Sequence, residues 1–318
     1  MPSRQPPARP YVSPTAKGVL LKILSTLAFA VMVVLIKLVS DRVPPGEVLF
    51  ARAFFGTLPV LVMLLLAGEL PKALRTSQPM GHVRRAVVGT ISMFCWFASL
   101  TYLPLPDATA INYAGPLFGV LFAAMLLGET VRIYRWSAVA VGFLGVLIVL
   151  SGQLTGDLAS GGADRLMGGL LALASAVFAA LAMVTVRSLT ATETTGAIVF
   201  YFSTSASVLA LLSLPFGWVM PLPMDALALV IAGLCGGVGQ VLMTQAYRYA
   251  EASAIAPFDY VNMIWIVIAS YAVFGDVPTA TVLIGSAIVI ASSIFVVLRE
   301  RRLGIERRRD AAAPGGQT

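Results

Sequence analysis

The sequence contains few charged residues. Only 12% of its 318 residues are charged and 58% are hydrophobic, whereas soluble domains carry about 25% charged residues. The charges gather in short segments between apolar stretches of about 20 residues, the length that a helix needs to cross the hydrocarbon of a bilayer. These features exclude a water-soluble fold and predict an all-α polytopic membrane protein.

Histidine and cysteine are also scarce. The single histidine, His82, lies in a polar segment, and the two cysteines, Cys95 and Cys235, lie in apolar segments. These residues cannot form a metal-binding cluster, so we expect neither a metal nor another cofactor. A membrane-embedded enzyme needs such ligands, or a nucleophile beside a base, and is the weaker alternative. No GxxxxGK[ST] loop is present, so direct use of ATP is not expected.

The net charge of +7 does not indicate nucleic-acid binding, which needs a basic face on a folded soluble domain. The densest basic run, within 299–309, directly follows an apolar segment. We therefore interpret residues 299–318 as a basic cytoplasmic tail that anchors the last span. Residues 1–15 are rich in proline and basic residues, and we expect them to be a disordered cytoplasmic segment.

Ten apolar segments are separated by short polar breaks or breaks rich in proline and glycine. A repeat of five transmembrane helices is expected over 16–151 and a second over 165–298, with a linker at 152–164. The predicted spans are 16–39, 46–67, 83–103, 107–127 and 134–151, then 165–187, 194–217, 225–249, 252–274 and 278–298.

The distribution of lysine and arginine supports an even number of spans. If the N-terminus is cytoplasmic, most basic residues, Lys17 and Lys22 among them, fall in cytoplasmic segments, and only Lys37, Arg42, Arg52 and Arg165 do not. This asymmetry follows the positive-inside rule. It predicts an inner (plasma) membrane protein with both termini in the cytoplasm.

The two halves resemble each other. A shift of 150 residues aligns Lys37 with Arg187, and a shift of 147 aligns Asn112 with Asp259 and Tyr113 with Tyr260. Because each half has an odd number of spans, the second half must be inserted upside down. Such an inverted repeat gives two related states that open to opposite sides, as alternating access requires.

Several segments resemble the EamA domain of the drug/metabolite transporter superfamily. IKLVSDRVPPGEVLFARAFFG at 36–56 is similar to its start, and WFASLTYLPLPDATAINYAGPLFGVLFAAMLLGETVRIYRW at 96–136 to its end. The second half keeps the pattern in YAEASAIAPFDY but has Phe202 where the first half has Arg52. The resemblance implies a ten-helix secondary transporter with a central cavity lined mainly by helices three, four, eight and nine.

Within that superfamily, PDATAINYAGPLF is most similar to members proposed to move riboflavin or S-adenosylmethionine. Uptake of such a metabolite is therefore expected. Proton-coupled efflux of amino acids or drug-like metabolites is the alternative within transport, and a channel is a further one. The expected partners are a small-molecule solute, protons and bilayer lipid, without nucleic acid; the sequence carries no signal for the oligomeric state.

Asp259 is the leading candidate for coupling. It lies inside the ninth span, where a carboxylate is costly unless it faces water, a cation or a polar partner. We expect it to bind a proton or a substrate cation, and a structural hydrogen bond to a neighbouring helix is the alternative.

Five further residues are candidates for substrate contact. Asn112 can donate and accept hydrogen bonds, or join helices. The rings of Tyr113, Tyr260 and Trp96 suit a planar substrate, or simply pack in the interior. Gln245 belongs to a polar patch in span eight.

Three basic residues are candidates for gating. Lys37 and Arg187 lie near span ends, where long side chains also serve as interface anchors. Arg52 lies about six residues inside span two and needs a partner or a wet cavity. Glu47, five residues earlier, does not face it at helical spacing.

Overall fold

The computed structural model describes residues 14–127, 133–154, 162–190, 192–250 and 255–312, and these residues form helices and connecting turns without a β-strand. The first half contains α1 (Pro14–Val39), α2 (Pro45–Leu66), the short α3 (Leu70–Ala73), α4 (Pro79–Tyr102), α5 (Leu105–Asn112), α6 (Gly115–Leu127) and α7 (Ile133–Leu154). The second contains α8 (Gly162–Leu189), α9 (Thr195–Ala210), η2 (Leu211–Phe216), α10 (Pro223–Tyr249), η3 (Ala256–Tyr260), α12 (Val261–Phe274) and α13 (Ala280–Ala312).

Proline and glycine set many helix boundaries. Pro45, Pro79 and Pro223 occupy the first helical positions of α2, α4 and α10, where the missing N–H has no intrahelical partner to lose. Gly217 and Gly275 follow η2 and α12 with φ of 93° and 71°, a left-handed conformation that glycine adopts at little cost. The sequence therefore encodes these ends locally.

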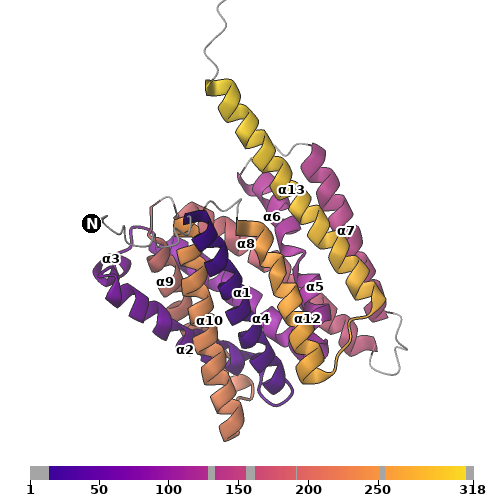
Figure 1. Cartoon of the computed structure of the whole chain (residues 1–318). Helices are drawn as coiled ribbons and strands as arrows, with labels where there is room; N and C mark the ends of the chain where they lie inside the picture. The colour runs from indigo at the N-terminus through magenta and orange to yellow at the C-terminus, as the bar shows by residue number, and fades with distance from the viewer. Residues whose placement is uncertain (1–13, 128–132, 155–161, 191, 251–254, 313–318) are drawn as a thin grey trace, which may run out of the picture.

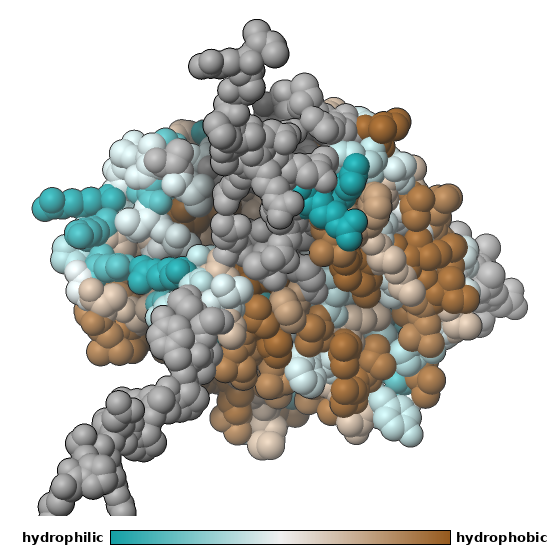
Figure 2. Space-filling model, turned by 45° about the horizontal axis from the view of Figure 1, so that its top comes forward, coloured by the Kyte–Doolittle hydropathy of each residue, from teal (hydrophilic) through white to brown (hydrophobic). Residues whose placement is uncertain are grey.

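The helices have the size and surface of membrane spans. Six of the described helices are long and apolar enough to cross a bilayer, and three shorter apolar stretches, Trp136–Gly152, Phe258–Phe274 and Ala280–Val296, accompany them. Figure 2 shows hydrophobic side chains over much of the face in view, with hydrophilic ones gathered toward its upper part and side. A soluble monomer does not expose such a surface. The chain is a multi-pass membrane protein.

Helices of the first half pack mainly against helices of the second half. α1 lies against α10, α4 against α8, and α7 against α13, while α2 contacts both α9 and α10. In Figure 1, α1 and α10 run side by side, as do α7 and α13, and α1 begins and α13 ends in the upper part of the view. The buried core joins these pairs, with Ile36, Leu100, Ile111 and Ile266 almost fully enclosed.

Two predicted spans are interrupted rather than continuous. The fourth, expected over 107–127, is divided into α5 and α6 at Tyr113 and Ala114, and the ninth begins as the 3₁₀ turn η3 before α12. The first part of the predicted basic tail, from 299 on, is helical, since α13 continues to Ala312. The arginine-rich segment keeps a helical conformation because nothing in it breaks the hydrogen-bond ladder begun in the apolar part.

Candidate solute-binding site

An ion pair between a buried lysine and a half-exposed aspartate joins α1 to η3. Lys22 Nζ lies 2.6 Å from Asp259 Oδ1; the lysine side chain is 1% exposed and the aspartate side chain 50% exposed. Lys22 Nζ also lies 5.5 Å from the centre of the Tyr247 ring on α10. The sequence groups Lys22 with the cytoplasmic basic residues and does not single it out as a site residue. The structure places it inside α1, about two turns after the start of the helix, and its position within the predicted first span was the available signal.

Tyr113 and Tyr260 lie together beside this ion pair. Their rings form an edge-to-face contact with centroids 5.4 Å apart, a preferred geometry for aromatic pairs. Tyr113 caps the end of α5, and Tyr260 ends η3, so both stand at the interruptions of their spans. Interrupted helices in the membrane are tolerated where they are enclosed by protein or line a cavity. The structure thus brings together three sequence-predicted residues, Asp259, Tyr113 and Tyr260.

Each of the two tyrosine hydroxyls has a polar neighbour that the sequence analysis did not identify. The Tyr113 hydroxyl lies beside Asn262 of α12, and the Tyr260 hydroxyl beside Ser293 of α13. Trp265 Nε1 is buried without a hydrogen-bond partner among the described residues. An orphaned donor of this kind is uncommon in a native interior and can bind a solute or water. Asn262 and Trp265 follow Asp259 at helical spacing, which was the available signal.

Asn112 holds helices together instead of contacting Asp259 directly. Its amide nitrogen donates a 3.0 Å hydrogen bond to Ser175 Oγ on α8, and Ser92 Oγ on α4 donates to the Ser175 carbonyl at 2.9 Å. Interhelical hydrogen bonds of this kind are typical of membrane helices. Asn112 therefore fixes the end of α5, immediately before the interruption at Tyr113.

The remaining predicted contact residues lie on other helices. Trp96 packs against the main hydrophobic core, and Gln245 Nε2 lies 3.8 Å from Met63 Sδ on α2. Lys37 donates a 2.5 Å hydrogen bond to the Leu100 carbonyl at the end of α4. Arg187 lies near the end of α8, but its side chain is outside the part of the chain that the structure describes.

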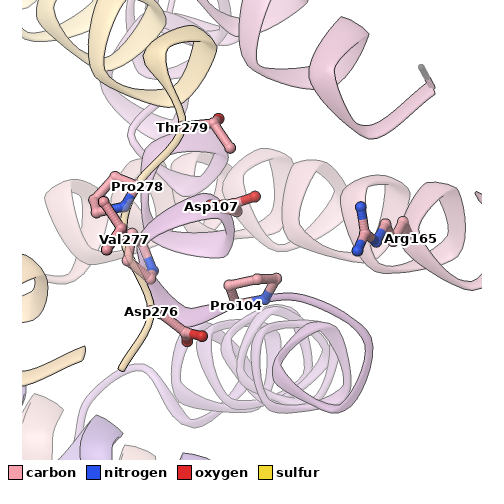
Figure 3. Close-up of a pocket in the computed structure, with 8 residues that line it drawn as sticks. Pro104, Asp107, Arg165, Asp276, Val277, Pro278 and Thr279 are labelled. Atoms are coloured by element: carbon pink, nitrogen blue, oxygen red, sulfur yellow. The ribbon is translucent and has the colours of Figure 1, made fainter. Parts of the chain in front are cut away.

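A cavity of about 140 Å³ lies at the end of the bundle opposite the start of α1. It is bounded by the α4–α5 connection, the start of α8 and the α12–α13 connection, and Figure 3 shows Asp107, Arg165 and Asp276 around it. Its lining comes from both halves of the chain. This cavity is separate from the tyrosine pair and differs from the central cavity that the resemblance implies.

Comparison with protein families gives a match to the EamA-like transporter family over residues 16–151 and again over 166–298. The chain belongs to this family. Its two matched segments account for most of the sequence, and the family and its named members are transporters. The EamA-like protein described here is accordingly a membrane transporter and not an enzyme.

Three relatives illustrate the range of solutes named in this EamA-like family. The chain is 32% identical to a pseudopaline exporter of Pseudomonas aeruginosa, over 87% of this chain and 94% of that one. It is 29% identical to an S-adenosylmethionine uptake transporter of Rickettsia prowazekii (90% and 94% covered) and 30% identical to a riboflavin transporter of Rhizobium johnstonii (90% and 92%). A crystal structure that is 22% identical, with a TM-score of 0.63, covers 90% of this chain and 98% of its own and shares the fold.

Two ion pairs fasten the ends of α10 in this EamA-like transporter. At one end, Arg42 donates from Nε and Nη2 to the two Asp225 carboxylate oxygens at 3.0 and 2.7 Å. At the other end, Arg248 Nη2 lies 3.2 Å from Glu69 Oε1. Both partners, Arg42 and Glu69, belong to connections in the first half. α10 is therefore tied to the first half at both membrane faces in this conformation.

Proposed function

We propose that this protein is a secondary-active carrier with ten transmembrane spans, arranged as two inverted five-helix repeats, that moves a small metabolite across the inner membrane by alternating access. The paired contacts support this arrangement: α1 packs on α10 as α8 packs on α4, and α1 contacts α12 as α8 contacts α6. A pseudo-twofold axis between the halves produces such matched contacts, because it maps each helix onto the equivalent helix of the other half. Cytoplasmic termini agree with the basic α13 extension.

The Lys22–Asp259 ion pair beside the two interrupted spans carries the proposal. The Lys22 charge is held out of water in the apolar bundle while Asp259 stays half exposed, and burying a charge to form an ion pair is a poor source of stability compared with hydrophobic packing. Such a pair suits a carrier because a proton or a substrate cation competes with Lys22 for the carboxylate. Release of Lys22 then frees η3 and α1 to move relative to each other.

The solute we favour is S-adenosylmethionine or riboflavin, taken up into the cell. Relatives named for these two solutes cover about nine-tenths of the chain, and the edge-to-face tyrosines Tyr113 and Tyr260 offer aromatic surface to a ring-bearing solute. The pseudopaline exporter relative favours efflux as the second candidate. The direction of net transport would then follow the solute and proton gradients.

The test is transport of both labelled solutes into proteoliposomes containing the wild type or Asp259→Asn. We expect Asp259→Asn to lower the initial rate at least tenfold and to abolish stimulation by a proton gradient, because the amide neither binds a proton nor attracts a cation. Asp164→Asn at the exposed start of α8 is the matched control and is expected to transport normally.

A variant that only unfolds is identified by the double substitution Lys22→Met/Asp259→Asn, which removes both charges. Asp259→Asn leaves the buried Lys22 charge unpaired, which costs roughly 3 kcal/mol of stability, so the double variant is expected to regain thermal stability but not transport. Asp259→Asn with full, gradient-driven transport would refute the assignment. If the labelled solute moves only in the direction that corresponds to export from the cell, efflux is the function.

A further inference from the structure

Arg52 is buried in the bundle, and no acid among the residues that the structure describes forms an ion pair with it. It lies in α2, is 8% exposed, and its Nε has no hydrogen-bond partner among the described residues. Glu47, the nearest acid along α2, accepts a hydrogen bond from the Val219 amide at 3.1 Å. The sequence predicts either a partner or a wet cavity for Arg52, and its Nε finds no partner in the described part of the chain.

Arg85 on α4 shows the same deficiency. Its Nε and Nη1 are buried without hydrogen-bond partners among the described residues. Its guanidinium carbon lies 3.8 Å from the centre of the Phe202 ring on α9, which leaves the edge of the guanidinium, where the N–H groups point, available to an anion. Phe202 is the residue that replaces the helix-two arginine in the second half. It serves here as the platform for Arg85.

Both side chains extend toward the middle of the bundle. Arg52 Nε is near Gly236, the central residue of α10 (Pro223–Tyr249). Arg85 Nη1 lies against Gly89, one turn further into α4. A basic side chain near a helix end ordinarily snorkels outward to the headgroup region. The inward direction of these two indicates that something in the interior attracts them.

The two arginines carry like charges on helices that are in contact, α2 and α4, and the charge of Arg52 acts unfavourably on the charged Arg85. Three acids of the described helices interact elsewhere: Asp225 binds Arg42, Asp259 binds Lys22, and Glu47 accepts from the Val219 amide. Arginine stays protonated in proteins, so the pair cannot escape the cost of burial by losing protons. Neutralisation must come from an anion that is not part of the described chain.

We propose that Arg52 and Arg85 bind an oxyanion, a carboxylate or phosphate, of the transported solute. The site is bounded by α2, α4, α9 and α10. Glycine at positions 89 and 236 leaves the room that the guanidinium groups occupy, because a Cβ at Gly89 would overlap Arg85 and one at Gly236 would crowd Arg52 and Met32. Arginine forks bind carboxylate and phosphate oxygens through paired, charge-assisted hydrogen bonds.

This inference rests on the proposed transport function and narrows its substrate class. A solute with an α-carboxylate, such as S-adenosylmethionine, satisfies the site, whereas riboflavin carries no oxyanion. Together with the Lys22–Asp259 region, the arginine pair would suit a solute with charges of both signs. The arginine pair distinguishes solutes with an oxyanion from solutes without one, whereas the tyrosines do not distinguish solutes by charge.

The test uses the purified full-length chain and matched probes that differ in the oxyanion. Thermal stability is titrated with S-adenosylmethionine against decarboxylated S-adenosylmethionine, which lacks only the carboxylate, and with riboflavin 5′-phosphate against riboflavin. Inorganic phosphate is compared with chloride at equal ionic strength. For the wild type we expect the oxyanion-bearing member of at least one pair to bind about tenfold more tightly or better, the effect of one or more charge-assisted hydrogen bonds.

Arg52→Gln and Arg85→Gln are expected to abolish that preference, while Arg84→Gln keeps it because Arg84 is the exposed neighbour of Arg85. The ligand-free Arg52→Gln protein should be no less heat-stable than the wild type, since the substitution removes repulsion between two cations. Arg52→Lys, which keeps the charge, is expected to retain part of the preference. A merely structural arginine would instead lower ligand-free stability and leave the ratio unchanged.

Two results would overturn the inference. One is an equal affinity of the wild type for the members with and without the oxyanion in both pairs, with phosphate no better than chloride. The other is stabilisation that depends on Arg52 and Arg85 but occurs only in nanodiscs containing phosphatidylglycerol, which would identify a lipid headgroup as the anion. In either case Asp259-dependent transport of a neutral solute would still support the proposed carrier function.

Discussion

Single charged side chains define the interior of this bundle. Lys22 and Asp259 neutralise each other across α1 and η3, whereas buried nitrogens of Arg52 and Arg85 have no hydrogen-bond partner among the residues that the structure describes. Because a membrane core offers no water to solvate an unpaired charge, the two situations have different consequences. The neutral pair is stable as it stands and can be exchanged during transport. The arginine pair is complete only when an anion is present.

Glu193, in the connection between α8 and α9, gives a pH-dependent contribution to stability. Partial burial raises the pKa of this carboxyl, but hydrogen bonds from Thr76, Ser77 and Gln78 outweigh it and bring the pKa below its usual value. Its Oε1 accepts from the Ser77 amide at 2.8 Å and the Gln78 amide at 3.2 Å. The carboxylate thus binds the backbone just before α4.

Because the folded-state pKa of Glu193 is below the unfolded value of about 4.3, the folded protein favours the ionised form. The stabilisation is complete above that value and is lost as the pH falls through the folded-state pKa. We expect Glu193→Gln to flatten the decline in melting temperature between about pH 5 and pH 3. Glu69→Gln, at an exposed ion pair, is the control. An unchanged pH profile in the Glu193 variant would contradict the expectation.

At the scale of the helices, small residues allow backbones to approach closely. α7 and α13 cross at Gly145 and Gly285: a Cβ on Gly145 would lie 2.8 Å from the Gly285 carbonyl oxygen, and one on Gly285 would lie 2.6 Å from the Gly145 oxygen. A side chain cannot fit against a backbone oxygen at these distances. Packing of glycine faces is a common basis for helix association in membranes.

We therefore expect Gly145→Ala to force α7 and α13 apart. The estimated cost is about 1–3 kcal/mol, typical of overpacking, and it is measurable as a lower melting temperature of the purified protein. Gly119→Ala on α6 is the matched control because a Cβ there meets nothing within 4 Å. That substitution should be neutral, or stabilise the helix by about 0.5–1 kcal/mol. Equal effects of the two substitutions would show that the close crossing is unimportant.

At the scale of the whole molecule, the contacts between halves determine which motions are available. α10 is bound to the first half by Arg42–Asp225 at one face and by Arg248–Glu69 at the other. A carrier that alternates must open one face at a time, so these two ties would break in different states. The exposed members of the pairs are solvated, and exposed ion pairs contribute little stability, which keeps the cost of such opening small.

A carrier and a channel differ in exchange behaviour. We expect proteoliposomes loaded with unlabelled solute to accumulate labelled solute transiently, and the initial rate to saturate with concentration, because each turnover requires a conformational change with bound solute. Asp259→Asn vesicles are the control and are expected to show neither effect. A linear, non-saturating flux without counterflow would indicate a pore and would contradict the alternating-access mechanism.

Much of the fold follows from residues that act locally. Apolar runs of span length, prolines at the first positions of α2, α4 and α10, and the left-handed glycines at 217 and 275 identify the helices and their ends. Part of the candidate site could also be predicted from the sequence. Asp259, Tyr113 and Tyr260 stand out because a polar group in an apolar span is costly wherever the helices lie, and their equivalent positions in the two halves supported the selection.

The sequence by itself determined that this chain spans a membrane, where its helices begin, and which residues carry unusual charge inside them, since hydropathy and backbone preferences depend on near neighbours. Only the tertiary structure decided which of these residues contact one another. Lys22 pairs with Asp259, Asn112 binds Ser175, Arg85 packs on Phe202, and Arg52 lies near Gly236. These are contacts between residues distant in the chain, and they depend on which helices cross and at what height, which no local pattern specifies.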